Sequence, residues 1–386
     1  MKPLYRQPLL ILTLALTVLA ALLWSGLPND DQSPDLTEQN SPLTSLLGGL
    51  EPEEPFPQVS APRPFDFPAD HLEHPEYQNE WWYFTGHLKE VGQDDYQYGF
   101  QFTLFRHALA PPRPDDTDWA SNQIYMGHLA LTDFTTGRHM ATEIFSRKGP
   151  DLAGTALQPP QVWVKHWRIQ SQQNDRWLPL MLEANAPELP LKLALTATSQ
   201  IPPVLQGIEG YSPKSPATAS YYYSYTHLEI FGTLSTDNKH ETHVTGQAWF
   251  DHEWSSSYLE SDQKGWDWFS LQLDNGMALM LFEIRSPVPE LNTRTVTLTD
   301  ANGQKIPLTP SDVETSVTKH WQSPSGRNYP AQWRLRIPSQ QMDVIITPRV
   351  ADQEMRLTVV YWEGAVQVKG THQGVGYVEL SGYQEE

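Results

Sequence analysis

Apolar and polar residues alternate with a period of two along most of this chain, which is the pattern of β-strands rather than of amphipathic helices. In the segment 96–104, Tyr96, Tyr98, Phe100, Phe102 and Leu104 alternate with Gln, Gly and Thr. This alternation predicts a strand with one buried face. The segments 163–169 and 333–337 alternate in the same way. The sequence therefore predicts an all-β protein.

Tight turns are expected between some of these strands. The tripeptide Asp274-Asn275-Gly276 and the dipeptide Asn302-Gly303 supply residues that adopt a positive φ, as short hairpins require. Antiparallel strands joined by short hairpins commonly close into barrels or form sandwiches. A barrel of about eight strands can hold one small ligand.

Similar segments recur in the same order in the two halves of the chain. The matching pairs are 81–88 with 266–273, 166–169 with 332–335, and 246–251 with 374–379. The first block of each half also leads into an apolar strand that ends in Arg, at Arg106 and Arg285. Such ordered self-similarity indicates a repeat. We infer two homologous β-domains, joined between Trp254 and Gly265.

Composition narrows the classes of function. The 386 residues carry a net charge of −20 and contain no Cys. Nucleic-acid binding needs clustered Lys and Arg, so we expect no nucleic-acid partner. The absence of Cys excludes disulfides, thiol catalysis and a lipoprotein anchor.

The N-terminus has the pattern of an export signal. Lys2 and Arg6 precede the apolar run 9–24. This run is shorter than the roughly 20 residues of a spanning helix, which favours a cleaved signal peptide over a retained anchor. We expect an exported protein, periplasmic or secreted, or tethered to the inner membrane if the segment is retained. Residues 28–62 are acidic and rich in Pro, without Lys or Arg, and predict a disordered linker.

The predicted organisation has four parts. A signal peptide or anchor occupies residues 1–27, and the acidic linker occupies residues 28–62. The N-terminal β-domain spans residues 63–254, and the C-terminal β-domain spans residues 255–386.

Several longer motifs stand out along the chain, namely NEWWYFTGHL, GHLALTDF, PPVLQGIEGYSPKSP, ASYYYSYTHLEIFGTL, FDHEWSSS, GWDWFSLQLDNGMALMLFEIR and YWEGAVQV. Together they resemble the AttH-like family, which belongs with the carotenoid 1,2-hydratase superfamily of lipocalin-like proteins. The resemblance covers the whole predicted folded part and implies two tandem lipocalin-like barrels. It also implies a secreted hydrolase or a companion of a membrane ABC exporter.

The hydratase branch of the resemblance implies a reaction without a cofactor. A carboxylic acid protonates an isoprenoid double bond, an aromatic ring stabilises the carbocation, and water is captured. Asp251 would be the acid, with its pKa raised by an apolar pocket. Trp249 or Trp254 would stabilise the cation, and His252 would orient Asp251 or deprotonate the water.

Further aromatic and acidic residues are candidates for lining the ligand cavity. They are Tyr221, Tyr223, Trp82, Trp266 and Asp267. An opposing interpretation is that aromatic-x-acid is a structural feature of a strand end, because Trp249 and Asp251 recur as Tyr377 and Glu379 in the second repeat.

Two other chemistries find less support in the sequence. Ser256 stands where a zinc-protease motif beginning at His252 needs its second His. His87, His128 and His227 show no metal-ligand spacing with His252, so we predict no metal site. The serines 255–257 lack the Gly-x-Ser-x-Gly elbow of a serine hydrolase.

Two hypotheses follow. In the first, the protein binds or transfers a lipophilic small molecule, held in a barrel or at the seam between the barrels, in partnership with an ABC exporter. In the second, the same cavity performs hydration or hydrolysis with Asp251 and His252. The sequence favours the binding protein.

Overall fold

The computed structural model describes residues 55–113, 121–237, 239–256, 259 and 263–384. The predicted signal segment and most of the predicted linker lie outside these residues. Strands dominate the described part, and its only helical segments are four single 3-10 turns, η1 (Ala69–His71), η2 (Pro289–Leu291), η3 (Pro310–Asp312) and η4 (Pro338–Gln340). Within it, no helix has the length and apolar character needed to cross a membrane. The all-β prediction is confirmed.

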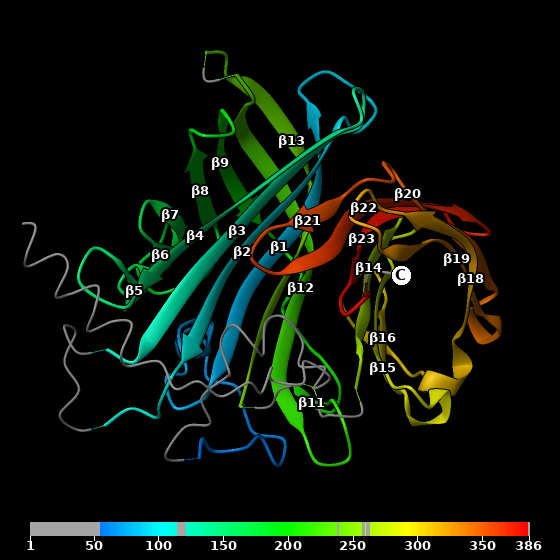
Figure 1. Ribbon diagram of the computed structural model, residues 1–386, viewed down its shortest axis with the longest axis horizontal. Helices are drawn as coiled ribbons and strands as arrows, with labels where there is room; N and C mark the ends of the chain where they lie inside the picture. The colour runs from blue at the N-terminus through cyan, green and yellow to red at the C-terminus, as the bar shows by residue number, and fades with distance from the viewer. Residues whose placement is uncertain (1–54, 114–120, 238, 257–258, 260–262, 385–386) are drawn as a thin grey trace, which may run out of the picture. The chain divides into compact units, whose positions relative to one another are not determined.

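The first half of the chain forms one antiparallel sheet that curls into a nearly closed barrel (Figure 1). Its strands are β1 (Asn79–Glu90), β2 (Tyr98–Ala108), β3 (Gln123–Asp133), β4 (Arg138–Arg147), β5 (Ala153–Leu157), β6 (Pro160–Val164), β7 (Trp167–Ser171), β8 (Leu180–Ala186), β9 (Leu191–Thr198), β10 (Val204–Leu205), β11 (Tyr211–Pro213), β12 (Ala219–Ser235) and β13 (Thr242–Ser255). They pair in the order β4-β3-β2-β1-β13-β12-β9-β8-β7-β6-β5, with β10 and β11 also paired to β12.

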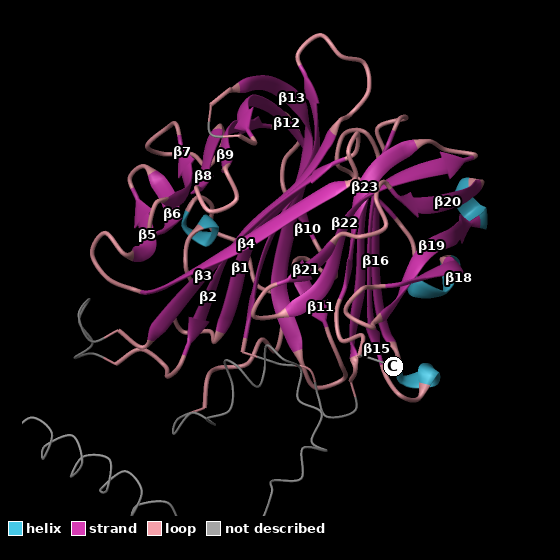
Figure 2. Ribbon diagram, turned by 45° about the horizontal axis from the view of Figure 1, so that its top comes forward, coloured by secondary structure: helices cyan, strands magenta, loops and turns pink. Residues whose placement is uncertain are grey.

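The second half forms a separate antiparallel sheet with the shape of a half-barrel (Figure 2). Its strands are β14 (Gly265–Leu273), β15 (Ala278–Arg285), β16 (Thr293–Thr299), β17 (Lys305–Ile306), β18 (Glu314–Gln322), β19 (Asn328–Ile337), β20 (Met342–Pro348), β21 (Glu354–Arg356), β22 (Val360–Gly370) and β23 (Gly374–Leu380). They pair in the order β17-β16-β15-β14-β23-β22-β20-β19-β18, and β21 pairs with β22.

The two sheets share one topology, as the sequence repeat predicts. When β1 is matched with β14, the neighbours β2 and β13 match β15 and β23. Register agrees as well, because Arg106 pairs with the residue before Trp81 and Arg285 pairs with the residue before Trp266. The match of 166–169 with 332–335 is wrong, since β19 takes the place of β8 rather than of β7.

The two predicted hairpins are present, whereas one predicted strand is interrupted. Gly276 and Gly303 have φ values of +83° and +77° in the two predicted hairpins. The segment 163–169 is not one strand, because Lys165, with φ at +54°, turns the chain between β6 and β7.

The prediction of one buried face for β2 is wrong, because both faces of this strand are buried. Phe100, Phe102 and Leu104 enter the core of the first barrel. Gln101 and Thr103 on the other face are buried as well. The second sheet covers this face, because β2 packs against β22 and Gly99 of β2 lies next to Ala365 and Tyr377. The polar residues of β2 therefore mark a contact between sheets and not a solvent surface.

Residues that join the sheets form a third apolar cluster beside the two cores. Its buried members are Tyr83, Tyr222, Trp249, Trp268, Ala278, Met280, Ala365 and Tyr377. Hydrogen bonds accompany the packing: the Gln272 amide donates to the Ala248 carbonyl oxygen at 2.9 Å, and the His87 ring bonds the Gly376 carbonyl oxygen at 2.9 Å. The outer face of β1 and β13 is therefore an interface.

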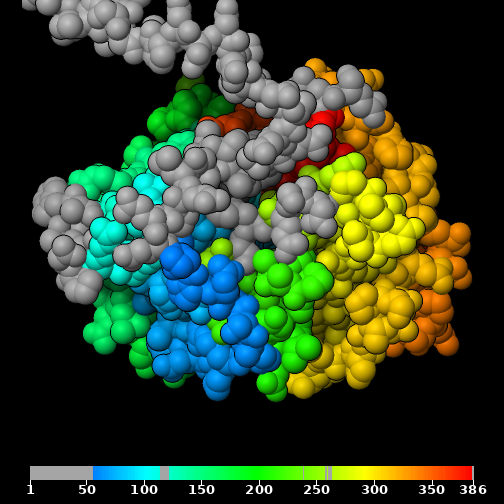
Figure 3. All heavy atoms as spheres, turned by 60° about the horizontal axis from the view of Figure 1, so that its bottom comes forward, coloured from blue at the N-terminus to red at the C-terminus, as the bar shows by residue number. Residues whose placement is uncertain are grey.

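The described end of the predicted linker is packed against the first barrel. Phe56 and Val59 are buried, and Val59 belongs to the first core. The Tyr221 hydroxyl donates to the Ala61 carbonyl oxygen at 3.1 Å, and Figure 3 shows this first segment, in blue, beside the green segment around β11 and β12. Ordered structure thus begins before the predicted position of residue 63.

Close approach of the central strands requires Gly at equivalent positions of the two sheets. A Cβ on Gly246 would lie 1.9 Å from the His87 carbonyl oxygen, and one on Gly374 would lie 2.2 Å from the Gln272 carbonyl oxygen. We expect Gly246→Ala and Gly374→Ala each to lower the free energy of unfolding by about 1–3 kcal/mol, because backbone must move to admit the methyl group. Urea unfolding measures the change. Thr245→Ala is the neighbouring control, and equal stability of Gly246→Ala and wild type would contradict the register described here.

Candidate functional site

The predicted site stretch divides between two environments, because successive side chains of a strand point to opposite faces. On β13, Trp249, Asp251 and Glu253 face the second sheet, whereas Phe250 and Trp254 enter the first core. The strand therefore serves two sites, one between the sheets and one inside the first barrel.

A cavity with about 220 Å³ of open space lies between the two sheets. Aromatic side chains from both sheets line it, including Trp81, Tyr83, Tyr222, Trp266, Trp268 and Tyr361. Carboxyl groups also line it, from Asp251 and Glu253 of β13 and from Glu363 and Glu379 of β22 and β23. Apolar walls with a few polar groups are typical of a small-molecule site.

Three donors surround the carboxyl group of Asp251. The Trp249 ring N–H donates to Oδ1 at 2.7 Å, the Ser224 hydroxyl donates to Oδ1 at 2.5 Å, and the Tyr222 hydroxyl donates to Oδ2 at 2.8 Å. Asp251 is 3% exposed. Burial raises the pKa of Asp251 to about 7, even though these hydrogen bonds act in the opposite direction. Its carboxyl group can therefore gain or lose a proton near neutral pH.

The second sheet contributes equivalent residues to the same cavity. Asp251 pairs with Tyr83 across the strands, and Glu379 pairs with Trp268 at the matching position of the repeat. The Trp266 ring N–H donates to Glu379 Oε1 at 2.8 Å. Burial raises the pKa of Glu379 to about 7.

A buried network that includes His252 lies inside the first barrel, and two of its members, Glu80 and Arg106, also border the cavity. Glu80 Oε2 accepts from the Arg106 guanidinium at 2.8 Å, and Glu80 Oε1 lies 2.7 Å from His74 Nδ1 and 2.9 Å from His252 Nε2. The His252 ring also bonds the Tyr223 hydroxyl at 3.1 Å. Although burial alone would raise the pKa of Glu80, Arg106 and His74 hold it well below its usual range.

The network inside the first barrel contains residue types that bind metals, but other protein groups already pair with these residues. Within the described residues, His74, Glu80 and His252 are the three groups whose ligand atoms come close enough to share an ion. Arg106 already neutralises Glu80, and Asp70 bonds the other nitrogen of His74 at 3.0 Å. These contacts explain the proximity of the three groups as an ion-paired hydrogen-bond network.

The predicted roles of His252 and of four aromatic residues need correction. His252 does not contact Asp251, because the two lie on opposite faces of β13, so it cannot orient Asp251 or act on water beside it. Trp82, Trp254, Tyr221 and Tyr223 likewise belong to the first core and do not line the cavity. The predicted residues that the structure brings together are Asp251, Trp249 and Trp266.

Asp267 also lies away from the cavity, on the other face of β14. Its carboxylate accepts from Arg285 Nε at 2.9 Å and from the Tyr383 hydroxyl at 3.1 Å. Burial raises the pKa of Asp267 to about 6. Its partners give it a structural role in the second sheet.

Sequence reasoning missed several cavity residues, namely Tyr83, Tyr222, Glu363 and Glu379. Tyr222 lies between Tyr221 and Tyr223, which the sequence predicts as cavity residues, but only the face of β12 that carries Tyr222 points to the cavity. Glu379 was visible as the partner of Asp251 in the repeat, which was the one signal that could have assigned it to the site.

Fold and cavity together define a lipocalin-like protein built from two tandem β-sheets with a carboxyl-lined site between them. The AttH-like family model matches residues 58–383, and the chain belongs to this family. It is similar to a putative AttH from Nitrosomonas europaea, with 32% identity and a TM-score of 0.72 over 85% of this chain and 99% of that one.

A second similar structure is kievitone hydratase from Nectria haematococca, with 17% identity and a TM-score of 0.64 over 86% of this chain and 98% of that one. At this identity the similarity shows a shared fold. No curated protein matches the sequence.

Asp251 makes a pH-dependent contribution to stability. Its folded pKa of about 7 lies above the ordinary value of 3.8, so between these values the unfolded chain releases a proton that the folded chain keeps. Stability attributable to Asp251 therefore falls as pH rises from about 4 to about 7. Over this interval, we expect the free energy of unfolding of Asp251→Asn to rise by up to about 4 kcal/mol relative to that of wild type, at about 1.4 kcal/mol per pKa unit.

Urea unfolding at several pH values measures this difference. Asp343→Asn is a control of opposite sign, because Arg334 lowers the pKa of Asp343 and its contribution is lost as pH falls. Parallel stability curves for wild type and Asp251→Asn would contradict the raised pKa.

Proposed function

We propose that this protein binds a lipophilic, unsaturated small molecule in the cavity between its sheets and adds water to a double bond, or removes it, without a cofactor. The observation that carries the proposal is the buried carboxyl group of Asp251, poised to exchange a proton in an aromatic cavity. Active-site carboxyl groups commonly have pKa values shifted toward neutrality by burial.

The walls of the cavity suit this chemistry. Protonation of an alkene produces a carbocation, and the faces of aromatic rings attract cations. Trp268 and Tyr222 belong to the aromatic cluster around Asp251, and the Trp268 ring N–H donates to the Tyr222 hydroxyl at 3.2 Å. The name of the kievitone hydratase with the same fold supports hydration as the reaction class.

A binding protein without turnover is the second candidate. The observation that favours it is the full set of donors around Asp251, which also suits a structural carboxylate. In both candidates the ligand is lipophilic and occupies the same cavity. Export and partnership with an ABC exporter remain proposals that rest on the N-terminal sequence and on the family resemblance.

The variant Asp251→Asn separates the two candidates. With farnesol and geranylgeraniol as probes in ¹⁸O-labelled water, we expect wild type to form hydrated products and the variant to lose about 100-fold or more in rate. Binding, followed by quenching of tryptophan fluorescence, should change little because the amide keeps the shape of the carboxyl group. Mass spectrometry detects the label.

Glu283→Gln is the control, since Glu283 lies outside the cavity and pairs with Arg294. Unchanged binding with no hydration by wild type would favour the binding protein over the enzyme.

A further inference from the structure

Two glutamates of the second sheet form a pair on one wall of the cavity. Glu363 on β22 and Glu379 on β23 are direct partners across the antiparallel strands, so their side chains share one face. Both line the cavity that Asp251 lines from the first sheet. The cavity therefore holds carboxyl groups on two opposing walls.

The surroundings of Glu363 favour a protonated carboxyl group. Glu363 is 2% exposed, and its Oε1 accepts a short hydrogen bond from the Tyr83 hydroxyl. Its Oε2 is buried and has no hydrogen-bond partner among the described residues. A buried carboxylate oxygen without a donor or a cation is costly, whereas a protonated carboxyl group is neutral and has a proton to donate.

The surroundings of Asp251 favour the opposite state. Trp268 can only donate to the Tyr222 hydroxyl, which directs the Tyr222 proton toward Asp251. The Gln206 amide donates to the Ser224 hydroxyl at 2.7 Å, and Ser224 in turn donates to Asp251. Both chains of donors end on the Asp251 carboxyl group, as a carboxylate requires.

We propose that Glu363 is the proton donor of the reaction and that Asp251 is the base that takes a proton from the attacking water. This inference rests on the proposed function, and it reverses the role of acid that the sequence suggested for Asp251. The second sheet supplies the acid and the first sheet supplies the base, so the reaction requires both sheets. Glu379 lies beside Glu363 as its cross-strand partner, and its negative charge disfavours the charged form of Glu363.

Hydration takes place in three steps. The double bond takes the proton from Glu363 Oε2, so that a C–H bond forms, the O–H bond breaks and a carbocation remains. The oxygen of water bonds to the cationic carbon, and one proton of that water moves to the Asp251 carboxylate. The product carries one added water, and proton transfer from Asp251 to Glu363 through water restores the starting state.

The pKa shifts of Glu363 and Asp251 agree with their roles as acid and base. Burial, together with the charge of Glu379, raises the pKa of Glu363 well above its usual range. The pKa of Asp251 stays near 7 because three hydrogen bonds oppose the effect of burial. Two carboxyl groups with separated pKa values are the usual arrangement for an acid and a base in one site.

The pH dependence of hydration distinguishes the two assignments. If Asp251 is the base, hydration of farnesol by wild type should rise as pH increases through about 7, because the carboxylate form is required. Hydration that falls over the same range both in wild type and in Glu379→Gln, which lacks the other cavity carboxyl group with a pKa of about 7, would overturn the inference, since Asp251 would then act as the acid.

Variants give a second test. Glu363→Gln should reduce hydration of farnesol about 100-fold or more, while binding followed by tryptophan fluorescence is retained. It should also remove an infrared band of a protonated carboxyl group that persists in wild type and in Asp251→Asn at pH 8. Glu354→Gln is a matched control, because Glu354 is a buried glutamate next to β22 that does not line the cavity.

Each remaining outcome is decisive. Hydration that survives Glu363→Gln but not Asp251→Asn, or an infrared band that this substitution leaves unchanged, would overturn the inference alone. No hydration of farnesol or geranylgeraniol by wild type would overturn the proposed function and this inference with it.

Discussion

The contact between the outer faces of the two sheets is the constraint on which the site depends. Each sheet has its own core, so neither needs the other to bury its inner face. The contact instead buries a second face of β1, β13 and β14, where Tyr83, Trp249 and Trp268 pack. Asp251 and Glu379 on that face lose their contact with water, and burial raises the pKa of each to about 7. A lone sheet would leave the same groups exposed.

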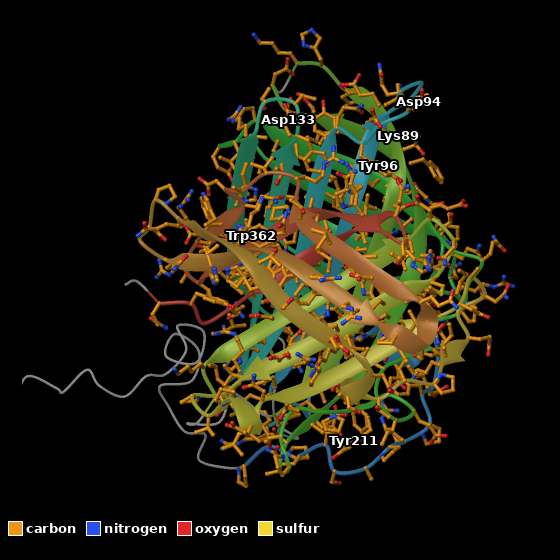
Figure 4. All side chains as sticks on the ribbon, turned by 90° about the vertical axis from the view of Figure 1, so that its right-hand side faces the viewer. Lys89, Asp94, Tyr96, Asp133, Tyr211 and Trp362 are labelled. Carbon is orange, nitrogen blue, oxygen red and sulfur yellow. The ribbon has the colours of Figure 1, made fainter. Side chains whose placement is uncertain are left out.

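The repeat explains why the site has two walls with different chemistry. Asp251 and Glu379 occupy equivalent positions, and Ser224 of the first sheet corresponds to Glu363 of the second, because each pairs with the acid of its own β13 or β23. One wall therefore supplies a hydroxyl donor to its acid, whereas the other supplies a second acid. Figure 4 shows Tyr211 near the lower end of the view and Tyr96 in its upper part, with Trp362 of the second sheet between these levels.

Sequence patterns predicted the all-β class, the two tandem units and two hairpins, and the family resemblance singled out Asp251, which lines the cavity. They failed to assign faces on the central strands. Tyr221 and Tyr223 were chosen instead of Tyr222 because a strand buried on both sides has no polar face to fix its orientation. The predicted contact between His252 and Asp251 rests on their being neighbours in the sequence. Neighbouring residues of a strand point to opposite faces, so this contact does not form. Glu363 carries no local signal, since its partner Glu379 is apparent only from strand register.

The proposed function requires that the ligand occupy the space between the sheets. A crystal structure of the protein with bound farnesol would show where the ligand lies. The isoprenoid chain should lie among Trp266, Trp268 and Tyr361, with a double bond beside Asp251 and Glu363. Farnesol within the core of the first barrel, next to Trp82 and His252, would contradict it.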